Sequence, residues 1–275
     1  MIWGIAGPWY GEYGCSDGDV LMKQLNFLVK NGFKSMTIGL EEMNDPARCD
    51  QIANFVAKHD MQLATHLYCN WIKGYQDDLK QRLDIFAEGM RKYADLLRVP
   101  IVTTGPGPTH RFMRQPPLKE QIELMSESLT PAAKLCHELG RPLGIENHGN
   151  YYCSDLVELC KMTPHLMIYL DTGNTYLIGE KSIPGCRDAA PYTIGTHFKD
   201  HYVEPNLPRL SFDLDGAPLG HGDVGLLEVY KILLENAPNP DKLIMHWEMV
   251  TPKGMNPLEC MEISWKFIRS LEEIA

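Results

Sequence analysis

Short apolar runs alternate with longer amphipathic stretches along the whole chain. Apolar, β-branched runs that are separated by helical patterns are typical of strands in a parallel sheet buried on both faces. We expect eight such strands, at Ile2–Ala6, Ser35–Leu40, Gln62–Leu67, Ile101–Thr104, Leu143–Asn147, Leu166–Asp171, Thr193–Lys199 and Leu243–Glu248.

The stretches between these runs carry apolar residues at helical spacing. In Asp19–Gly32, for example, Leu21, Leu25 and Leu28 share one face, and Gly32 is expected to end the helix. We expect helices at Asp19–Gly32, Ala47–His59, Asp77–Leu97, Leu118–Gly140, Ser154–Met162, Leu226–Asn236 and Leu258–Ile274. The helical pattern between the sixth and seventh strands is weak, so a helix there should be short.

Eight strand–helix units in 275 residues fit an α/β fold, a single (β/α)8 TIM barrel, with one catalytic domain over residues 1–275. The alternative is an open, doubly wound sheet, which would need a Gly-rich phosphate loop after the first strand. The sequence there is AGPWYGEYG, which does not match that motif. No linker or internal repeat interrupts the pattern.

Long connections follow four of the expected strands, at Gly7–Asp17, Tyr68–Tyr75, Gly105–Pro117 and His201–Val224. All of them leave the carboxyl ends of strands, whereas the helix-to-strand connections are short. Because active sites of such barrels lie at the carboxyl ends of the strands, this asymmetry predicts the functional face.

Four consecutive expected strands end on a side chain that can bind a metal ion: Glu146, Asp171, His197 and Glu248. In a closed barrel these strand ends converge on one axis. Packed carboxylates repel one another, and a divalent cation relieves that repulsion. Three carboxylates and one imidazole form a hard, oxygen-rich set that suits one Mn2+ or Mg2+ ion first, with Co2+ or Zn2+ also open. Any one of these acids alone could instead cap a helix, but four in succession favour a common site.

The segments around these residues, GIENHGN, DTGN, HFKD, GHGD and the final Glu248, resemble the xylose isomerase-like barrel superfamily of sugar and sugar-phosphate isomerases and epimerases. The resemblance runs the length of the chain. It implies Glu146, Asp171, His197 and Glu248 as metal ligands. In the ketose 3-epimerase branch the two matching glutamates also act as the acid–base pair, which implies that role for Glu146 and Glu248.

Two positions depart from the ketose 3-epimerase pattern. Asn174 stands where that branch commonly has histidine, and Val203 stands where it commonly has arginine. The segment HFKD is closer to the inosose isomerase and dehydratase branches. Within it, Lys199 could bind a substrate hydroxyl or stabilise an oxyanion, or could form a salt bridge to Asp171.

Further candidates for substrate binding are side chains expected at the same mouth, each with a plainer interpretation. His66 ends the third strand and could instead be a buried, hydrogen-bonded histidine. Trp9 and Trp71 could stack on a sugar or simply cover apolar ground. His221 lies in a Gly-rich loop that could also be an ordinary turn. Together with Asn174 and Lys199, these residues complete the expected substrate site.

The formal net charge of −10 and the lack of a basic run disfavour nucleic acid as a partner. No apolar run is long enough to span a membrane, and no signal peptide is evident, which favours the cytoplasm. The eight cysteines show no C-x-x-C pair and are expected to be free thiols. We expect a small carbohydrate-like substrate, and a homo-oligomer stays open.

The sequence thus favours a metal-dependent isomerase or epimerase of a sugar, sugar derivative or cyclitol, which acts by abstracting a proton next to a carbonyl. The same first step could lead to elimination, so a lyase or dehydratase of a keto-sugar or inosose is the alternative. An endonuclease IV-like phosphodiesterase is disfavoured by the acidic charge and the small number of histidines. A non-catalytic sugar-binding barrel is disfavoured by the complete set of four ligands.

Overall fold

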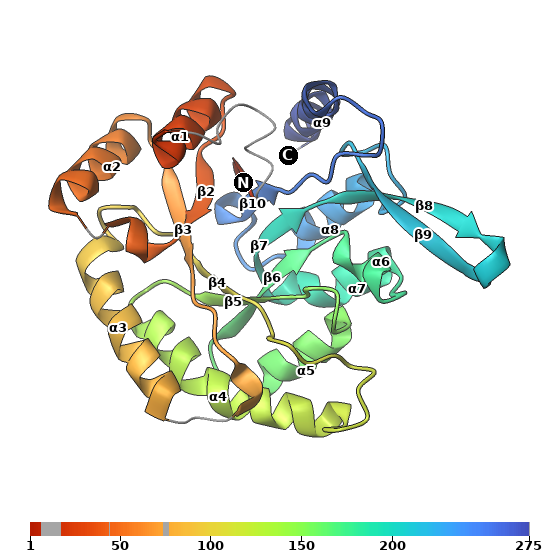
Figure 1. The fold of residues 1–275 in the computed structure, drawn as a ribbon, viewed down its shortest axis with the longest axis horizontal. Helices are drawn as coiled ribbons and strands as arrows, with labels where there is room; N and C mark the ends of the chain where they lie inside the picture. The colour runs from red at the N-terminus through yellow and green to blue at the C-terminus, as the bar shows by residue number, and fades with distance from the viewer. Residues whose placement is uncertain (7–17, 44, 74–76, 275) are drawn as a thin grey trace.

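Eight parallel strands form a closed barrel surrounded by helices (Figure 1). The computed structural model describes residues 1–6, 18–43, 45–73 and 77–274. Around the barrel the strands follow the order β1-β10-β7-β6-β5-β4-β3-β2. Their bounds are β1 (Ile2–Ile5), β2 (Ser35–Ile38), β3 (Gln62–His66), β4 (Val102–Thr104), β5 (Leu143–Glu146), β6 (Leu166–Asp171), β7 (Thr193–Phe198) and β10 (Ile244–Trp247). The predicted TIM barrel is confirmed, with strand ends within two residues of those expected.

The helices lie outside the barrel and match the predicted stretches. Their bounds are α1 (Val20–Lys30), α2 (Pro46–Lys58), α3 (Asp77–Tyr93), α4 (Leu118–Glu138), α5 (Cys153–Met162), α6 (Asn174–Leu177), α7 (Ser182–Ala189), α8 (Leu226–Asn236) and α9 (Pro257–Glu272). The prediction of a short helix between β6 and β7 is confirmed, since α6 and α7 have four and eight residues. Among the described helices, none is long and apolar enough to cross a membrane.

The barrel interior changes from apolar to polar along its axis. At the amino-terminal end, Ile101 and Ile244 pack against the ring of Tyr169. In the layer above, the Tyr169 hydroxyl lies 2.7 Å from His246 Nδ1, and Ser35 Oγ lies 2.9 Å from His246 Nε2. All of these side chains are buried, so hydrogen bonding to one another replaces the water they lose.

Two glycines make room for Tyr169 inside the barrel. A Cβ atom on Gly195 would lie 2.8 Å from the Tyr169 ring, and one on Gly144 would lie 3.1 Å from Tyr169 Cβ. Both glycines are on strands next to β6. A side chain at either position would displace the tyrosine, and with it the polar layer that supports the strand ends.

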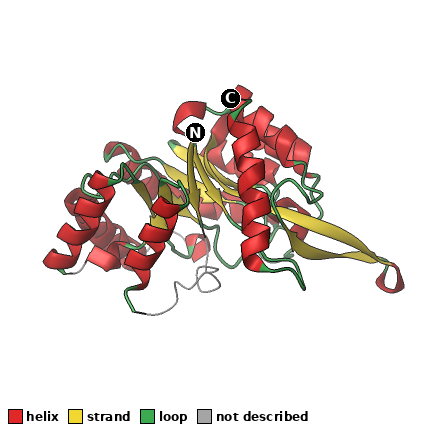
Figure 2. Ribbon diagram, turned by 90° about the horizontal axis from the view of Figure 1, so that it is seen from above, coloured by secondary structure: helices red, strands yellow, loops and turns green. Residues whose placement is uncertain are grey.

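The segment after β7 differs from the prediction. Residues His201–Val224 were expected as a long loop, but most of this segment forms an antiparallel hairpin of β8 (Asp200–Asn206) and β9 (Ser211–Ala217). The proline at position 205 disfavours a strand in sequence reasoning, because proline donates no ladder hydrogen bond. In a two-stranded sheet each strand is an edge, so Pro205 is tolerated. Figure 2 shows the hairpin extending beyond the helices.

Asp200 fixes the base of this hairpin. Its Oδ2 accepts hydrogen bonds from the backbone N–H groups of Gly220 and Gly222, at 2.9 and 3.0 Å. Its Oδ1 accepts from those of His201 and Val224, at 3.0 and 3.2 Å. The side chain is 1% exposed, so these four donors depend on it in place of water.

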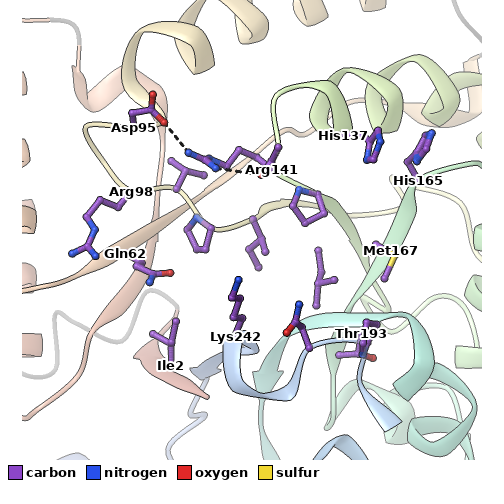
Figure 3. Close-up of a pocket in the computed structure, with 18 residues that line it drawn as sticks. Ile2, Gln62, Asp95, Arg98, His137, Arg141, His165, Met167, Thr193 and Lys242 are labelled. Atoms are coloured by element: carbon purple, nitrogen blue, oxygen red, sulfur yellow. Dashed lines mark hydrogen bonds and ion pairs between the residues drawn. The ribbon is translucent and has the colours of Figure 1, made fainter.

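A cavity of about 830 Å3 lies at the amino-terminal ends of the strands, away from the predicted functional face (Figure 3). Ile101 and Met167 form part of its apolar lining, and Arg98, Arg141 and Lys242 are on its rim. The two arginines are paired, Arg98 with Asp60 and Arg141 with Asp95. None of the four predicted metal ligands lines this cavity.

Replacing Asp200 with alanine should destabilise the protein, because backbone N–H groups around it would lose their acceptor. We expect the free energy of unfolding to fall by about 2–4 kcal/mol, given 1–3 kcal/mol for each buried group left without a partner. Urea denaturation followed by circular dichroism measures this. Asp84→Ala, at an exposed position on α3, is the control and should change little. A loss below about 1 kcal/mol for Asp200→Ala would contradict the role given to this carboxylate.

Candidate metal and active site

The four predicted ligands lie together at the carboxyl ends of the barrel strands. Glu146 ends β5, Asp171 ends β6, His197 is on β7, and Glu248 follows β10. Side chains alternate across a strand, so each of these residues faces the barrel interior one layer above Gly144, Tyr169, Gly195 and His246. The register confirms this arrangement, because Asp171 pairs with His197 and Tyr169 pairs with Gly195.

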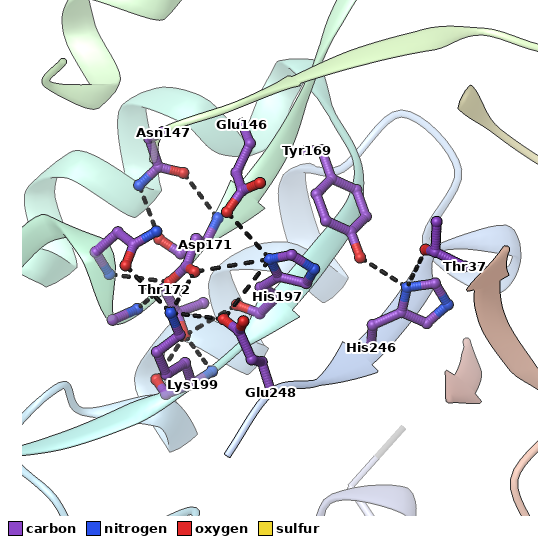
Figure 4. Close-up of polar contacts among 12 residues, drawn as sticks. Thr37, Glu146, Asn147, Tyr169, Asp171, Thr172, His197, Lys199, His246 and Glu248 are labelled. Atoms are coloured by element: carbon purple, nitrogen blue, oxygen red, sulfur yellow. Dashed lines mark hydrogen bonds and ion pairs between the residues drawn. The ribbon is translucent and has the colours of Figure 1, made fainter. Parts of the chain in front are cut away.

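One imidazole nitrogen is the point on which the carboxylates converge (Figure 4). His197 Nδ1 lies 3.1 Å from Glu146 Oε1, 3.7 Å from Glu248 Oε2 and 3.8 Å from Asp171 Oδ2. Glu146 and Asp171 are 5% and 0% exposed. Negative charge from three other strand ends is therefore held around one nitrogen, almost out of contact with water.

Burial and the neighbouring charges shift the pKa values of His197, Asp171 and Glu248. Burial lowers the pKa of His197, but the neighbouring carboxylates, Glu146 first, outweigh burial and raise it to about 9. Burial raises the pKa of Asp171 to about 6, against the opposing effect of Lys199. Burial would also raise the pKa of Glu248, but His197 and Lys199 lower it to about 2. The site demands positive charge, and in its absence the acids would not all be ionised.

Lys199 supplies part of that charge. Its Nζ lies 2.5 Å from Glu248 Oε2 and 2.9 Å from Asp171 Oδ2, and it donates a hydrogen bond of 3.2 Å to Asn174 Oδ1. The predicted salt bridge to Asp171 is thus present. Both carboxylate oxygens are buried, and the Lys199 ammonium is the nearest cationic group to them among the described residues. A metal ion that bound both oxygens would take the place that the Lys199 ammonium group occupies beside them.

A divalent ion fits the arrangement. Glu146, Asp171 and His197 each offer one ligand atom, and these atoms lie within 4.8 Å of one another. Oxygen and imidazole donors of this kind suit hard or intermediate divalent metals. Glu248 is not part of that set of three, because its Oε2 is turned toward Lys199, but it remains 3.7 Å from His197 Nδ1.

Hydrogen bonds to the neighbouring backbone hold Asp171 in place. Asp171 Oδ1 accepts from the N–H groups of Gly173 and Asn174, both at 2.9 Å, which leaves Oδ2 for the site. The side chain of Asn147 accepts from the Asp171 N–H at 2.7 Å and donates to the Asp171 carbonyl at 2.8 Å. These contacts fix the end of β6 next to the end of β5.

A cavity of about 390 Å3 opens beside the four ligands. Glu146, His197 and Glu248 line it. The other residues around it are both apolar and polar, and they are Ile5, Ala6, Gln24, Met36, Thr37, Tyr68, Thr103 and His148. This volume is at the lower end of the range for small-molecule sites.

The residues expected to bind substrate do not gather around this cavity. Asn174 and Lys199 lie in the buried network next to Asp171. His66 stacks on Tyr68, with ring centroids 4.7 Å apart, and burial lowers its pKa. Its ring is not among the described groups that line the cavity.

The structure places Trp71 and His221 away from the cavity. Trp71 is fully buried in the core, and its Nε1 donates to Thr104 Oγ1 and to the Gly105 carbonyl, both at 3.0 Å. His221 is exposed in a turn, where its N–H donates to the Pro218 carbonyl. Trp9 lies outside the described residues.

Sequence reasoning did not single out Tyr68 or Asn147. Tyr68 lines the cavity from the start of the loop after β3, and burial first, then Glu146 and Glu248, raise the pKa of its hydroxyl. Its position directly after a strand end was the available signal. Asn147 directly follows Glu146 in the sequence, but its hydrogen-bond partner, Asp171, is on the neighbouring strand β6, which only the structure shows.

Three solved structures share this fold over almost the whole chain. The D-psicose 3-epimerase of Clostridium cellulolyticum H10, solved with D-tagatose, has a TM-score of 0.71 at 14% identity, with 99% of each chain covered. The probable 3-DHS dehydratase AsbF of Bacillus anthracis, involved in petrobactin synthesis, has a TM-score of 0.65 at 15% identity, with 98% of this chain and 99% of that chain covered. A xylose isomerase-like TIM barrel protein of Mycobacterium smegmatis, in complex with magnesium, has a TM-score of 0.67 at 14% identity, with 94% of this chain and 90% of that chain covered.

At these identities the structures show the fold alone. Among curated proteins, no sequence matches this chain. A family model does match, over residues 25–270, which is most of the chain. The barrel topology agrees with that match. This chain belongs to the xylose isomerase-like TIM barrel family.

Proposed function

We propose that this protein is a divalent-metal-dependent isomerase or epimerase of a sugar, sugar derivative or cyclitol. The observation that carries the proposal is the convergence of Glu146, Asp171 and Glu248 on His197 Nδ1, at distances of 3.1 to 3.8 Å. It lies at the end of the barrel where such enzymes have their active sites. Family membership and the likeness to a sugar epimerase support the reaction class.

Glu146, Asp171, His197 and Glu248 would hold the metal ion. When bound, a divalent ion polarises a substrate carbonyl and stabilises the negative charge that develops on the neighbouring oxygens. The donor set favours Mn2+ or Mg2+, with Co2+ or Zn2+ open. The magnesium complex of the Mycobacterium smegmatis protein supports a divalent ion for this fold.

We assign the proton transfer to the two glutamates. Glu146 comes from β5 and Glu248 from the end of β10, and β6 and β7 stand between those strands in the barrel wall. The two carboxylates therefore reach the cavity from separated parts of its wall. Lys199 and His197 keep Glu248 ionised, which is the form that accepts a proton. Two bases on opposite faces of a carbon give epimerisation, whereas one base that serves neighbouring carbons gives isomerisation.

The cavity favours a substrate without a phosphate group. No lysine or arginine is among the described residues that line it. The unplaced segment 7–17 contains neither residue in its sequence. Threonine, tyrosine and histidine side chains line the cavity instead, and these suit neutral hydroxyl groups.

A dehydratase of a keto-sugar or inosose is the second candidate. Lys199 favours it, because its ammonium group lies 2.5 Å from the proposed base Glu248 and could assist the departure of a β-hydroxyl group. The Bacillus anthracis dehydratase shows the same fold. Both reactions begin with the same proton abstraction, so the product distinguishes them.

Glu146→Gln and Glu248→Gln should each lower turnover by about 10²–10⁴-fold, the range for loss of a general acid or base. Incubation of the Mn2+-loaded protein in D2O with ketoses, aldoses, inososes and 3-keto-sugars, followed by NMR, measures exchange and product together. Glu235→Gln, at an exposed position on α8, is the matched control and should keep full activity.

Deuterium exchange into an isomeric product supports the isomerase or epimerase. A product lighter by one water establishes the dehydratase instead. If both glutamine variants retain exchange while they hold metal, the acid–base assignment is wrong.

Asp171→Asn should weaken divalent-metal binding by at least about 100-fold, since a lost ligand costs more than a lost supporting contact. The asparagine retains an oxygen for the Gly173 and Asn174 N–H groups, so the fold should persist. Elemental analysis after dialysis, with circular dichroism as the folding check, measures both effects. Asp188→Asn, exposed on α7, is the control. Unchanged metal content in Asp171→Asn would remove Asp171 from the site.

Metal binding should release a proton from His197. Its pKa of about 9 without metal means that it is protonated at pH 7, and a protonated imidazole cannot bind a metal. Metal affinity should therefore rise with pH up to about 9, and proton release should decrease from nearly one per metal at pH 7 as the pH approaches 9. Calorimetry in buffers of different ionisation enthalpy measures the proton count. A metal affinity that does not change between pH 6 and pH 9 would contradict a protonated His197 in the metal-free protein. The control variant, His221→Gln, should match the wild type.

A further inference from the structure

The β8–β9 hairpin has one apolar face and one acidic face. Residues directly opposite one another share a face, and the register pairs Val203 with Leu214 and Pro205 with Phe212. We call these four residues the apolar arm face. The opposite face carries the pairs Tyr202–Asp215, Glu204–Asp213 and Asn206–Ser211. Such a face needs a partner, because an isolated two-stranded hairpin is marginally stable in water.

The tip extends this apolar surface into solvent. Leu207 and Leu210 are 75% and 94% exposed, and Phe212 on the adjoining strand is 44% exposed. Leu210 also has φ of +49°, a left-handed conformation that leucine rarely adopts and that glycine or asparagine would favour. A surface turn with no partner has no reason to place leucine there.

A groove lies between the same face and the α6–α7 region. Its volume is about 460 Å3, and Val203 and Phe212 form one wall. Tyr176, Ile183 and Pro184, from the α6–α7 region, form the facing wall. We call this the base groove. The groove has room for a leucine side chain, and its apolar lining matches the apolar side chains of the tip.

The charges of the tip and the groove are complementary. The tip carries one cation, Arg209, between its two leucines. The rim of the base groove carries Glu180 and Asp223, with Lys181 as its one opposing cation. An arginine that arrives with the leucines would therefore meet the Asp223 carboxylate, whereas Glu180 already accepts from the Cys153 N–H.

We propose that the hairpin is a dimerisation arm, and that the apolar arm faces of two copies of this chain pack together in opposite directions. A two-fold axis across the arms places the tip of each copy in the base groove of the other. Each copy then offers both the knob and the hole, which is what an isologous dimer requires. This two-fold arrangement buries both exposed tips and fills both grooves.

The acidic face restricts the alternatives. Glu204, Asp213 and Asp215 lie on it, so two arms cannot pack through that face without bringing like charges together. The same carboxylates, with a net charge of −10, oppose insertion of the tip into an anionic membrane surface. Pro205 lacks an N–H group, which disfavours edge-to-edge addition of a strand along β8.

The first test is the oligomeric state of the full, metal-loaded chain by sedimentation velocity, from about 1 to about 100 µM, which spans a Kd near 10 µM. We expect a dimer whose Kd rises about 30-fold or more in Leu210→Asp, as for a buried interface anchor. Ile85→Asp is the matched control, because Ile85 is 64% exposed on α3, outside the arm and the groove. Both sites are solvent-exposed, so both variants should fold.

The second test fixes the arrangement. In Leu210→Cys/Ile183→Cys, oxidation should give a disulfide-linked dimer, because the tip of one copy lies in the base groove of the other. Non-reducing electrophoresis separates this link between two chains from a link within one chain, because only the former doubles the mass. Leu210→Cys/Ile85→Cys should give no such tip-to-groove link.

A wild-type chain that stays monomeric up to about 100 µM overturns the proposal, since a useful interface binds well below that. A dimer that Leu210→Asp leaves intact also overturns it, because another surface would then hold the copies together. Absence of the Leu210→Cys/Ile183→Cys crosslink in a dimer refutes the antiparallel arrangement of the arms.

Discussion

The mutual repulsion of Glu146, Asp171 and Glu248 is the constraint on which the carboxyl end of this barrel is built. Three other strand ends bring carboxylate oxygens within 3.8 Å of His197 Nδ1, where little water reaches. Such a cluster is unfavourable unless positive charge joins it. His197 and Lys199 supply that charge within the chain, and a divalent ion would supply it more completely. The need for a cation and the ability to bind one are the same property of this site.

The layer below the ligands keeps that charge in place. Burial first, and then His197, lower the pKa of His246 to about 3, so this second imidazole stays neutral beneath the first. Tyr169 hydrogen-bonds His246 and stands edge-on to His197, with ring centroids 4.8 Å apart. This neutral, hydrogen-bonded layer adds no competing charge below the site, and its Tyr169 ring packs against one side of the His197 ring.

The chain after β7 joins the site to the surface of the protein. Lys199 contacts Asp171 and Glu248, and the next residue, Asp200, fixes the base of the β8–β9 hairpin. Tyr176 lies in the base groove, two residues after Asn174 begins α6. Its hydroxyl donates a hydrogen bond to the Asp223 carbonyl. Contacts made by the arm therefore begin within a few residues of the buried network around Asp171.

Local patterns in the sequence determined the barrel and the positions of the four predicted ligands. Period-two alternation placed Glu146, Asp171, His197 and Glu248 on inward positions, and closure of eight strands brought them to one axis, so no tertiary information was needed for their meeting. The tertiary structure alone decided what each side chain contacts. Trp71, expected at the substrate, lies in the core because Thr104 and Gly105 accept its N–H. The hairpin was missed because Pro205 argues against a strand until it is known to be an edge. Lys199, Asn174 and Asn147 make their contacts with residues 24 to 49 positions away in the chain. These residues become neighbours only once the barrel has closed, so local sequence patterns did not reveal the contacts.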